Sequence, residues 1–254
     1  GIVLTPRHIT KFATNVSQIN NMDYVLDPAC GTGGFLVSAF DRVKKQISNN
    51  ELETYKKTKL HGIEQDAEVV SLAIVNMIFR GDGKTNIYEG NCFTSQKINS
   101  KKFNKVLMNP PFALKKGDEK EFKFIGYGLS KLETNGLLFA IIPNSIMTSR
   151  SELHWRKKML SENSLLASIK LPDDLFYPVA VCTVAILIKK GIPHNFEENV
   201  FFADLKDGYE KKKSVMIKKS EGNIESVEHK MLEFLNSKKE YNQAKEIVTC
   251  PIIN

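Results

Sequence analysis

Residues 24–40, YVLDPACGTGGFLVSAF, decide the fold. The stretch opens with a short aromatic and aliphatic run, which predicts a strand that ends at Asp27. Gly31, Gly33 and Gly34 follow in a turn, and the apolar residues after them have helical spacing. A strand, a glycine-rich turn and a helix form the first half of a β-α-β unit, so this stretch favours an α/β domain with parallel strands.

Strands and helices of similar length alternate along most of the chain. We expect seven strands, at 24–26, 61–63, 86–88, 103–108, 136–142, 165–171 and 181–188, and helices at 35–45, 67–79, 122–132 and 153–160. Thr5 and Pro6 predict an N-capped helix that runs to Val16. This alternation predicts a doubly wound, mostly parallel seven-stranded sheet with helices on both faces.

The pattern loosens after Lys190. Residues 200–203 predict an edge strand, the lysine-rich stretch 206–219 a loop, and 226–235 a helix. We therefore expect a catalytic domain at 1–190 and a C-terminal extension at 191–254.

The glycine turn is a candidate ligand site. Open α/β sheets bind ligands outside the carboxyl ends of their strands, and glycines let the backbone approach a ligand closely. The spacing matches neither a P-loop nor a dinucleotide fingerprint, and a carboxylate at Asp27 suits a cationic or hydroxyl-bearing ligand. Glu64, at the end of the second strand, can accept both hydroxyls of a ribose. A valine at Gly33 is expected to fill the site; a glycine turn without a ligand and a surface-exposed glutamate are the alternatives.

Asn109-Pro110-Pro111-Phe112 follows the fourth predicted strand. The prolines fix φ, remove two N–H donors and push Asn109 out of the helical region. The Asn109 side-chain oxygen and the Pro110 carbonyl then form a rigid pair of acceptors, which can hold both hydrogens of a planar amino group and free its lone pair. Phe112 offers a face for a stacked ring. A nucleobase amine fits this motif, and a turn that only ends a strand is the alternative.

Composition excludes several classes of protein. With 254 residues, 42% hydrophobic and 26% charged, the chain is in the globular range, which rules out disordered, collagen-like and coiled-coil chains. The longest apolar stretch, 179–188, is too short for the roughly 18 residues of a membrane helix. The four cysteines form no C-x-x-C pair and have no histidines at ligand spacing, which predicts no metal site and suits a reducing cytoplasm.

The charge permits an anionic partner. Lys and Arg outnumber Asp and Glu by 36 to 29, and the whole surplus of seven lies in residues 101–170, which include the Asn109 motif. A positive surface beside such a site, with Lys115 and Lys116 among its residues, is what phosphate-backbone binding requires. Because 31 of the 36 basic residues are lysine, an AT-rich coding genome is the alternative explanation.

DPACGTGGF, GIEQD and NPPF, in that order and preceded by TPR, resemble the amino-group class of S-adenosylmethionine-dependent DNA methyltransferases, above all the modification subunit of type I restriction-modification systems. LTPRHITKF, GLLFAIIPNSIM, LPDDLF and VCTVAILIKKG extend the likeness over nearly the whole chain. The resemblance implies the methyltransferase fold and methyl transfer to the N6 amino group of adenine in DNA. Methylation of protein glutamine or of RNA remains the alternative, because these substrates also present an sp² amine.

The resemblance also implies roles for individual residues. S-adenosylmethionine would be held by Thr5, Asp27, Pro28, Gly31, Gly33, Glu64 and Asn91, with Asn91 standing where the family often has an acidic residue. Catalysis would rest on Asn109, Pro110 and Phe112, and Phe176 in LPDDLF would be a further wall for the extruded base or an ordinary core residue. No metal and no cysteine nucleophile would be needed, so Cys30 and Cys92 would be packing residues.

Recognition of DNA is expected to need a partner. Only about 64 residues follow the last confident strand, which is too few for a substantial target-recognition domain. The resemblance places recognition of double-stranded DNA in a separate specificity subunit, with a restriction subunit as a further partner, and predicts a helical region before Gly1. The catalytic segment of a fused restriction and modification polypeptide is the alternative. The recognition sequence, the partner and the oligomeric state do not follow from this sequence.

Overall fold

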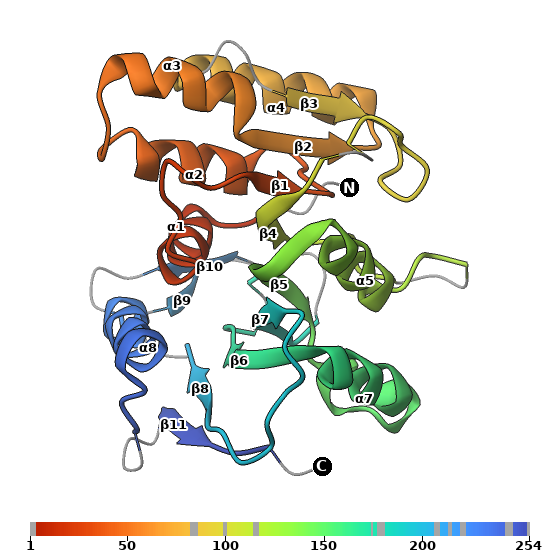
Figure 1. Cartoon of the computed structure of the whole chain (residues 1–254), viewed down its shortest axis with the longest axis vertical. Coiled ribbons are helices and arrows are strands. Elements are labelled where there is room, and N and C mark those ends of the chain that lie inside the picture. Colours follow the sequence, from red (N-terminus) through yellow and green to blue (C-terminus); the bar gives the residue numbers. More distant parts are fainter. Residues whose placement is uncertain are drawn as a thin grey trace. The chain divides into compact units, whose positions relative to one another are not determined.

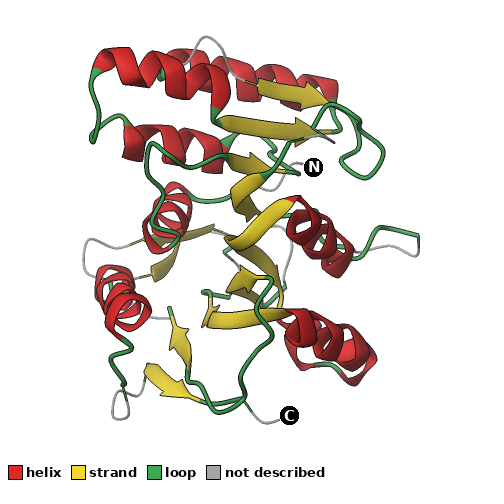
Figure 2. Ribbon diagram, viewed as in Figure 1, coloured by secondary structure: helices red, strands yellow, loops and turns green. Residues whose placement is uncertain are grey.

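The computed structural model describes residues 4–81, 86–98, 101–113, 117–173, 175–176, 181–205, 209–212, 215–218, 222–241 and 246–252. The chain divides into two compact units, Gly1–Phe139 and Ala140–Asn254. Both units contain helices and strands, which alternate through most of the first unit (Figures 1 and 2). The predicted α/β class is confirmed.

The first unit is built on parallel strands. These are β1 (Val25–Asp27), β2 (Leu60–Glu64), β3 (Asn86–Glu89) and β4 (Phe103–Met108), in the spatial order β4-β1-β2-β3. The strand β5 (Leu132–Pro143) is next to β4 in this order and crosses the division between the units. Because β1 lies between β4 and β2, the turns that follow these three strands emerge at one edge of the sheet.

Five helices belong to this unit. They are α1 (Arg7–Val16), α2 (Gly34–Val43), α3 (Asn49–Thr58), α4 (Ala67–Phe79) and α5 (Glu121–Lys131). Helix α1 packs on α2, α2 and α4 contact β2, and α5 packs on β4. In Figure 2, α1 and α5 flank the strands on opposite sides, as the prediction of helices on both faces requires.

The start of α1 differs from the prediction. The helix begins at Arg7, Pro6 occupies the N-cap position with extended backbone (φ −58°, ψ 143°), and no side chain caps it. The carbonyl of Pro6 accepts the N–H groups of Ile9 and Thr10 instead. The predicted N-cap at Thr5 is therefore wrong, and its hydroxyl is available for another contact.

Helix α3 was not expected from the sequence, because its composition is polar. A capping box explains why it forms: the Ser48 hydroxyl accepts the N–H of Glu51, and the Glu51 carboxylate accepts the N–H of Ser48. Leu52 and Tyr55 are the apolar residues that it buries. The helix closes the connection from α2 to β2.

The second unit is a mixed sheet with helices. It contains α6 (Asn144–Thr148), a 3₁₀ turn (Arg150–Glu152), α7 (Leu153–Glu162), β6 (Asn163–Lys170), β7 (Thr183–Lys190), β8 (Val200–Asp204), α8 (Ile224–Ser237) and β11 (Ile247–Cys250). Strand β6 pairs antiparallel with β7 and parallel with β8, and β11 pairs antiparallel with β8. Phe234 of α8 packs against Phe201 of β8, with ring centroids 5.8 Å apart.

Two expectations about strands are corrected. The strand order includes nine strands, against the seven predicted, because it takes in both the expected edge strand β8 and the unexpected β11. The expected loop at 206–219 contains an antiparallel hairpin, β9 (Tyr209–Lys212) and β10 (Val215–Lys218). This stretch is rich in lysine and shows little alternation of apolar and polar residues, so its sequence did not predict strands. None of the described helices is both long and apolar enough to cross a bilayer.

Candidate functional site

The glycine turn after β1 is tied to the neighbouring strand by its backbone. The N–H of Cys30 donates to the carbonyl of Ile63 on β2 at 2.9 Å, and the N–H of Gly33 donates to Cys30 at 2.8 Å. On the other side, the Asn76 amide of α4 donates to the carbonyl of Thr32 at 2.9 Å. The turn is therefore held from β2 and from α4.

Gly31 and Gly33 have different surroundings, although both have positive φ, +52° and +82°. A Cβ added at Gly33 would meet Ala73 of α4 at 3.6 Å, whereas a Cβ at Gly31 would meet nothing within 4 Å. The open side of the turn therefore lies at Gly31. A Cβ at Gly33 would contact α4 at ordinary van der Waals distance, and the effect of a valine there on ligand binding stays a prediction.

Glu64, at the end of β2, has a structural role beyond the predicted one. One carboxylate oxygen accepts the N–H of Gly31 at 2.9 Å, and the other accepts the N–H groups of Gln65 and Asp66 at 2.8 and 3.0 Å. The half-buried carboxylate thus positions the glycine turn. It is not a freely exposed surface glutamate, and its remaining lone pairs stay available to a ligand.

Asp27 is buried at the end of β1, next to the buried Pro28. Burial raises the pKa of the Asp27 carboxyl well above its ordinary 3.8, and the nearby charge of Glu64 raises it further, although the N–H of Ala29, 3.2 Å away, opposes the shift. The ion pairs among the described residues include no Lys or Arg partner for either carboxylate. A ligand with positive charge or hydroxyl donors would compensate these two groups.

Asn91 follows β3, so candidate ligand residues follow three neighbouring strands. The N–H of Gly90 donates to the Glu64 carbonyl at 2.8 Å, and the Asn91 side-chain oxygen accepts the N–H of Phe93 at 2.9 Å. The half-buried Phe93 ring packs on Phe124 of α5, with centroids 4.8 Å apart. Sequence reasoning missed Phe93 as a site residue, although the aromatic residue in GNCF was a usable signal.

The Asn109 motif lies at the end of β4, directly beside β1. The Asn109 Nδ2 donates to the Thr5 hydroxyl oxygen at 3.0 Å. The Asn109 Oδ1 is buried and accepts no hydrogen bond from the part of the chain that the structure describes. Pro110 is buried and Phe112 is half-buried. A buried, unused acceptor is costly unless a ligand satisfies it, so its presence indicates a donor that arrives from outside.

The turn is also fixed from its other end. The N–H of Ala113 donates at 2.8 Å to the carboxylate of Glu121, a buried residue of the first turn of α5. The anchors on both sides of Pro110 and Pro111 hold the motif as a rigid element. Asn109 is therefore held by Thr5 and Ala113 by Glu121.

The two cysteines near the site have the environment of packing residues, as predicted. Cys30 and Cys92 are both buried. Burial raises the pKa of the Cys92 thiol to about 12 and also raises that of Cys30. Both thiols therefore stay protonated and are poor nucleophiles near neutral pH.

Three other predicted residues lie in the second unit or outside the described residues. Phe176 belongs to the second unit, where its side chain is buried, and its role as a wall for the base stays a prediction. Lys115 and Lys116 lie outside the described residues.

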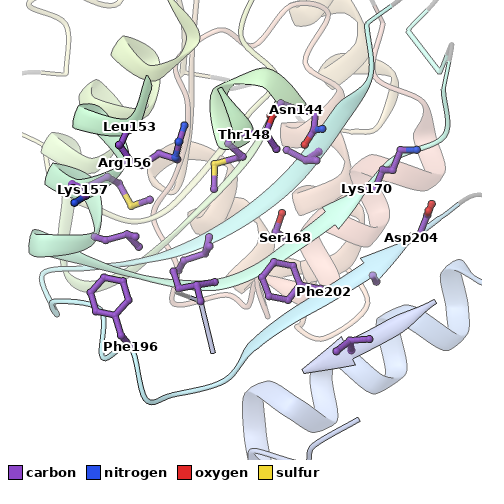
Figure 3. Close-up of a pocket in the computed structure, with 18 of the residues that line it drawn as sticks. Asn144, Thr148, Leu153, Arg156, Lys157, Ser168, Lys170, Phe196, Phe202 and Asp204 are labelled. Atoms are coloured by element: carbon purple, nitrogen blue, oxygen red, sulfur yellow. The ribbon is translucent and has the colours of Figure 1, made fainter. Parts of the chain in front are cut away.

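A pocket of about 540 Å³ lies within the second unit (Figure 3). Helices α6 and α7 and strands β6 and β8 contribute to its lining, and Phe196 and Phe202 project into it. None of the site residues predicted from the sequence lines this pocket.

Known proteins resemble this chain in sequence. The family model described as N-6 DNA Methylase matches residues 1–253. The type II restriction enzyme and methyltransferase RM.BcgI of Heyndrickxia coagulans is 40% identical over 216 residues, which are 82% of this chain and 34% of that protein. The type I restriction enzyme EcoEI methylase subunit of Escherichia coli is 26% identical over 97% of this chain and 54% of its own length.

Solved structures show the same fold. A modification subunit of a putative type I restriction enzyme from Vibrio vulnificus YJ016 superposes with a TM-score of 0.80 at 21% identity, covering 99% of this chain and 55% of that one. The chain thus spans about a third to a half of the length of these relatives. Since the family model matches the chain over nearly its full length, the chain belongs to the N-6 DNA methylase family.

Proposed function

We propose that this chain is the catalytic part of a DNA methyltransferase, which transfers a methyl group from S-adenosylmethionine to the N6 amino group of adenine in double-stranded DNA. The observation that carries the proposal is the buried, unused Oδ1 of Asn109, at the end of the strand that pairs with β1. The proposed setting is the cytoplasm, which the cysteine pattern of the sequence suits. Residues 1–190 would form the catalytic domain and 191–254 its extension.

The glycine turn fits S-adenosylmethionine. When bound, this cofactor supplies a methyl group on a positively charged sulfur. The space over Gly31 admits a ligand against the backbone, and Asp27 and Glu64 lack a cationic partner among the described residues. Asn91 and Phe93 would complete the site with an amide and an aromatic face. The Thr5 hydroxyl accepts a hydrogen bond from Asn109, and the predicted contact of Thr5 with the cofactor stays a prediction.

The Asn109 motif fits the amine of the base. Asn109 Oδ1 and the Pro110 carbonyl would accept the two N–H groups of adenine N6, which turns the nitrogen lone pair out of conjugation with the ring. As positive charge develops on that nitrogen, both acceptors would stabilise the charge. One of the two N–H protons would then pass to water. Phe112 would stack on the base after it leaves the duplex.

The proposed DNA substrate rests on the family and on relatives whose names describe methylase subunits. A specificity subunit and a restriction subunit are the proposed partners, because relatives of this chain are named methylase subunits of type I restriction enzymes. A fused polypeptide is a second candidate, favoured by the relative at 40% identity whose name joins a restriction enzyme and a methyltransferase. Cleavage of unmethylated DNA by the purified full-length polypeptide alone would identify the fused form.

The test is single-turnover transfer of labelled methyl to duplex DNA by the complete protein that carries this chain, assembled with its specificity partner. Asn109→Ala should lower the rate two to three decades, because losing one positioned acceptor costs about 3 to 4 kcal/mol. Thermal stability and cofactor affinity should change little. Asn20→Ala, an exposed amide in the same unit, is the matched control and should keep the wild-type rate.

Digestion to nucleosides identifies the acceptor. Label in N6-methyladenine that persists at the wild-type rate in Asn109→Ala would refute the mechanism. Label in protein glutamine or in RNA would replace the proposed substrate by the alternative.

A further inference from the structure

We propose that Thr5 is a positioning residue for the target amine: its hydroxyl holds the Nδ2 end of Asn109, so that the Oδ1 end faces the substrate. This inference rests on the proposed function and deepens it. It also gives Thr5 a different role from the cofactor contact that the sequence predicted.

The first step is that the Thr5 hydroxyl is not engaged at the helix start. Thr5 lies two residues before α1, and no side chain caps that helix. Its recorded partner is Asn109, 104 residues away in sequence, at 3.0 Å. A threonine beside a helix start ordinarily caps the helix. Here its hydroxyl bonds a distant residue, so we assign this contact to the site and not to the helix.

The second step is that Thr5 is attached to a rigid support. Helix α1 buries Ile9, Phe12 and Val16, and the hydroxyls of Thr10 and Ser38 join it to α2 at 2.6 Å. Arg7, at the first position of the helix, forms an ion pair with Asp41 of α2. Helix α2 is the helix that follows the glycine turn, so the position of Thr5 is fixed relative to that turn.

The third step concerns the chemistry of an amide. Asn109 has a donor end and an acceptor end of nearly the same shape, and only the acceptor end can receive an amine hydrogen. A partner that accepts from Nδ2 leaves Oδ1 on the opposite side, where it is buried and unused. Without that partner, the Asn109 amide could turn so that its Nδ2 end faces the substrate. Its N–H donors would then meet the N–H donors of the substrate amine. In the orientation that the structure shows, Thr5 therefore holds the amide with its acceptor end free for an amine hydrogen.

The experiment compares Thr5→Val, which removes the hydroxyl at similar size, with Thr5→Ser, which keeps it. At saturating S-adenosylmethionine, single-turnover methyl transfer by the complete protein with its partner should fall about 10- to 100-fold in Thr5→Val, as expected for a misplaced reacting group. Thr5→Ser should recover most of the rate. Calorimetry should give both variants wild-type affinity for S-adenosylhomocysteine.

Thr14→Val is the matched control. Thr14 is a buried threonine of α1, and its hydroxyl donates to the Lys11 carbonyl of the same helix at 2.8 Å. Its loss should leave the transfer rate unchanged, so any general weakening of α1 is separated from the effect of Thr5.

A second readout does not depend on activity. In the ¹⁵N spectrum, the Asn109 side-chain amide, identified by its absence in Asn109→Ala, should exchange slowly with solvent in the wild type and quickly in Thr5→Val. Wild-type exchange in Thr5→Val would overturn the proposal, and so would weaker cofactor binding with a normal rate at saturation, which would make Thr5 a cofactor contact. If the wild type methylates an acceptor other than adenine, the proposed function fails, while the effect of Thr5→Val on that acceptor's amine still tests this inference.

Discussion

Gly31 is the position where a single added methyl group should separate cofactor binding from folding. A Cβ there meets no protein atom within 4 Å, so Gly31→Ala adds no clash within the unit. The substitution should destabilise the fold by about 1 kcal/mol, because a residue with a Cβ is strained in a left-handed backbone conformation. Gly31 has such a conformation, with φ at +52°. In a chain of this length that destabilisation lowers Tm by about 2 to 4 °C.

The cost to the cofactor should be larger than the cost to folding. If the space over Gly31 is the cofactor site, the methyl group overpacks it, which costs about 1 to 3 kcal/mol. The dissociation constant, expected to be micromolar, should then rise about 5- to 150-fold. Calorimetry with S-adenosylhomocysteine gives this number, and a thermal melt gives the stability.

Gly81 supplies the matched control. It follows α4, has φ +91°, and a Cβ there also meets nothing within 4 Å. Gly81→Ala should therefore lose similar stability and keep the wild-type affinity. Equal affinity in Gly31→Ala and in the wild type, with the fold intact, would refute the placement of the cofactor.

Three further outcomes are expected. Because the pKa of Asp27 is raised in the folded state, the folded state binds more protons than the unfolded chain. The contribution of Asp27 to stability therefore falls as pH rises from 3.8 through the raised value. Asp27→Asn should lose this pH dependence, should be more stable than the wild type above that window in thermal melts, and should bind S-adenosylhomocysteine more weakly. Phe112→Trp should keep more methyl transfer than Phe112→Ala, because stacking is worth about 1 to 3 kcal/mol per base, and equal rates would exclude stacking. Lys102 and Lys123 are both exposed. Replacing either one should flatten the log-log salt dependence of DNA binding by about 0.9 if that lysine contacts a phosphate. An unchanged slope would favour the explanation that an AT-rich coding genome causes the lysine excess.

The sequence predicted the first unit well because its strands are short apolar runs bounded by turn residues. Asp27, Glu64 and Asn109 could be found because each directly follows such a run. The polar helix α3 and the lysine-rich hairpin carry little hydrophobic periodicity, so pattern reading missed both. Side-chain contacts between distant segments leave no local signal, which is why the contact of Thr5 with Asn109 could not be predicted.

The attachment of the glycine turn to α4 has a kinetic consequence. The Asn76–Thr32 hydrogen bond and the packing of Gly33 on Ala73 hold the turn in shape without help from a ligand. A site that is already formed requires little ordering on binding, so association of the cofactor should proceed without a slow rearrangement. Differences in affinity between variants of this turn should then appear as changes in the residence time of the cofactor rather than in its rate of arrival.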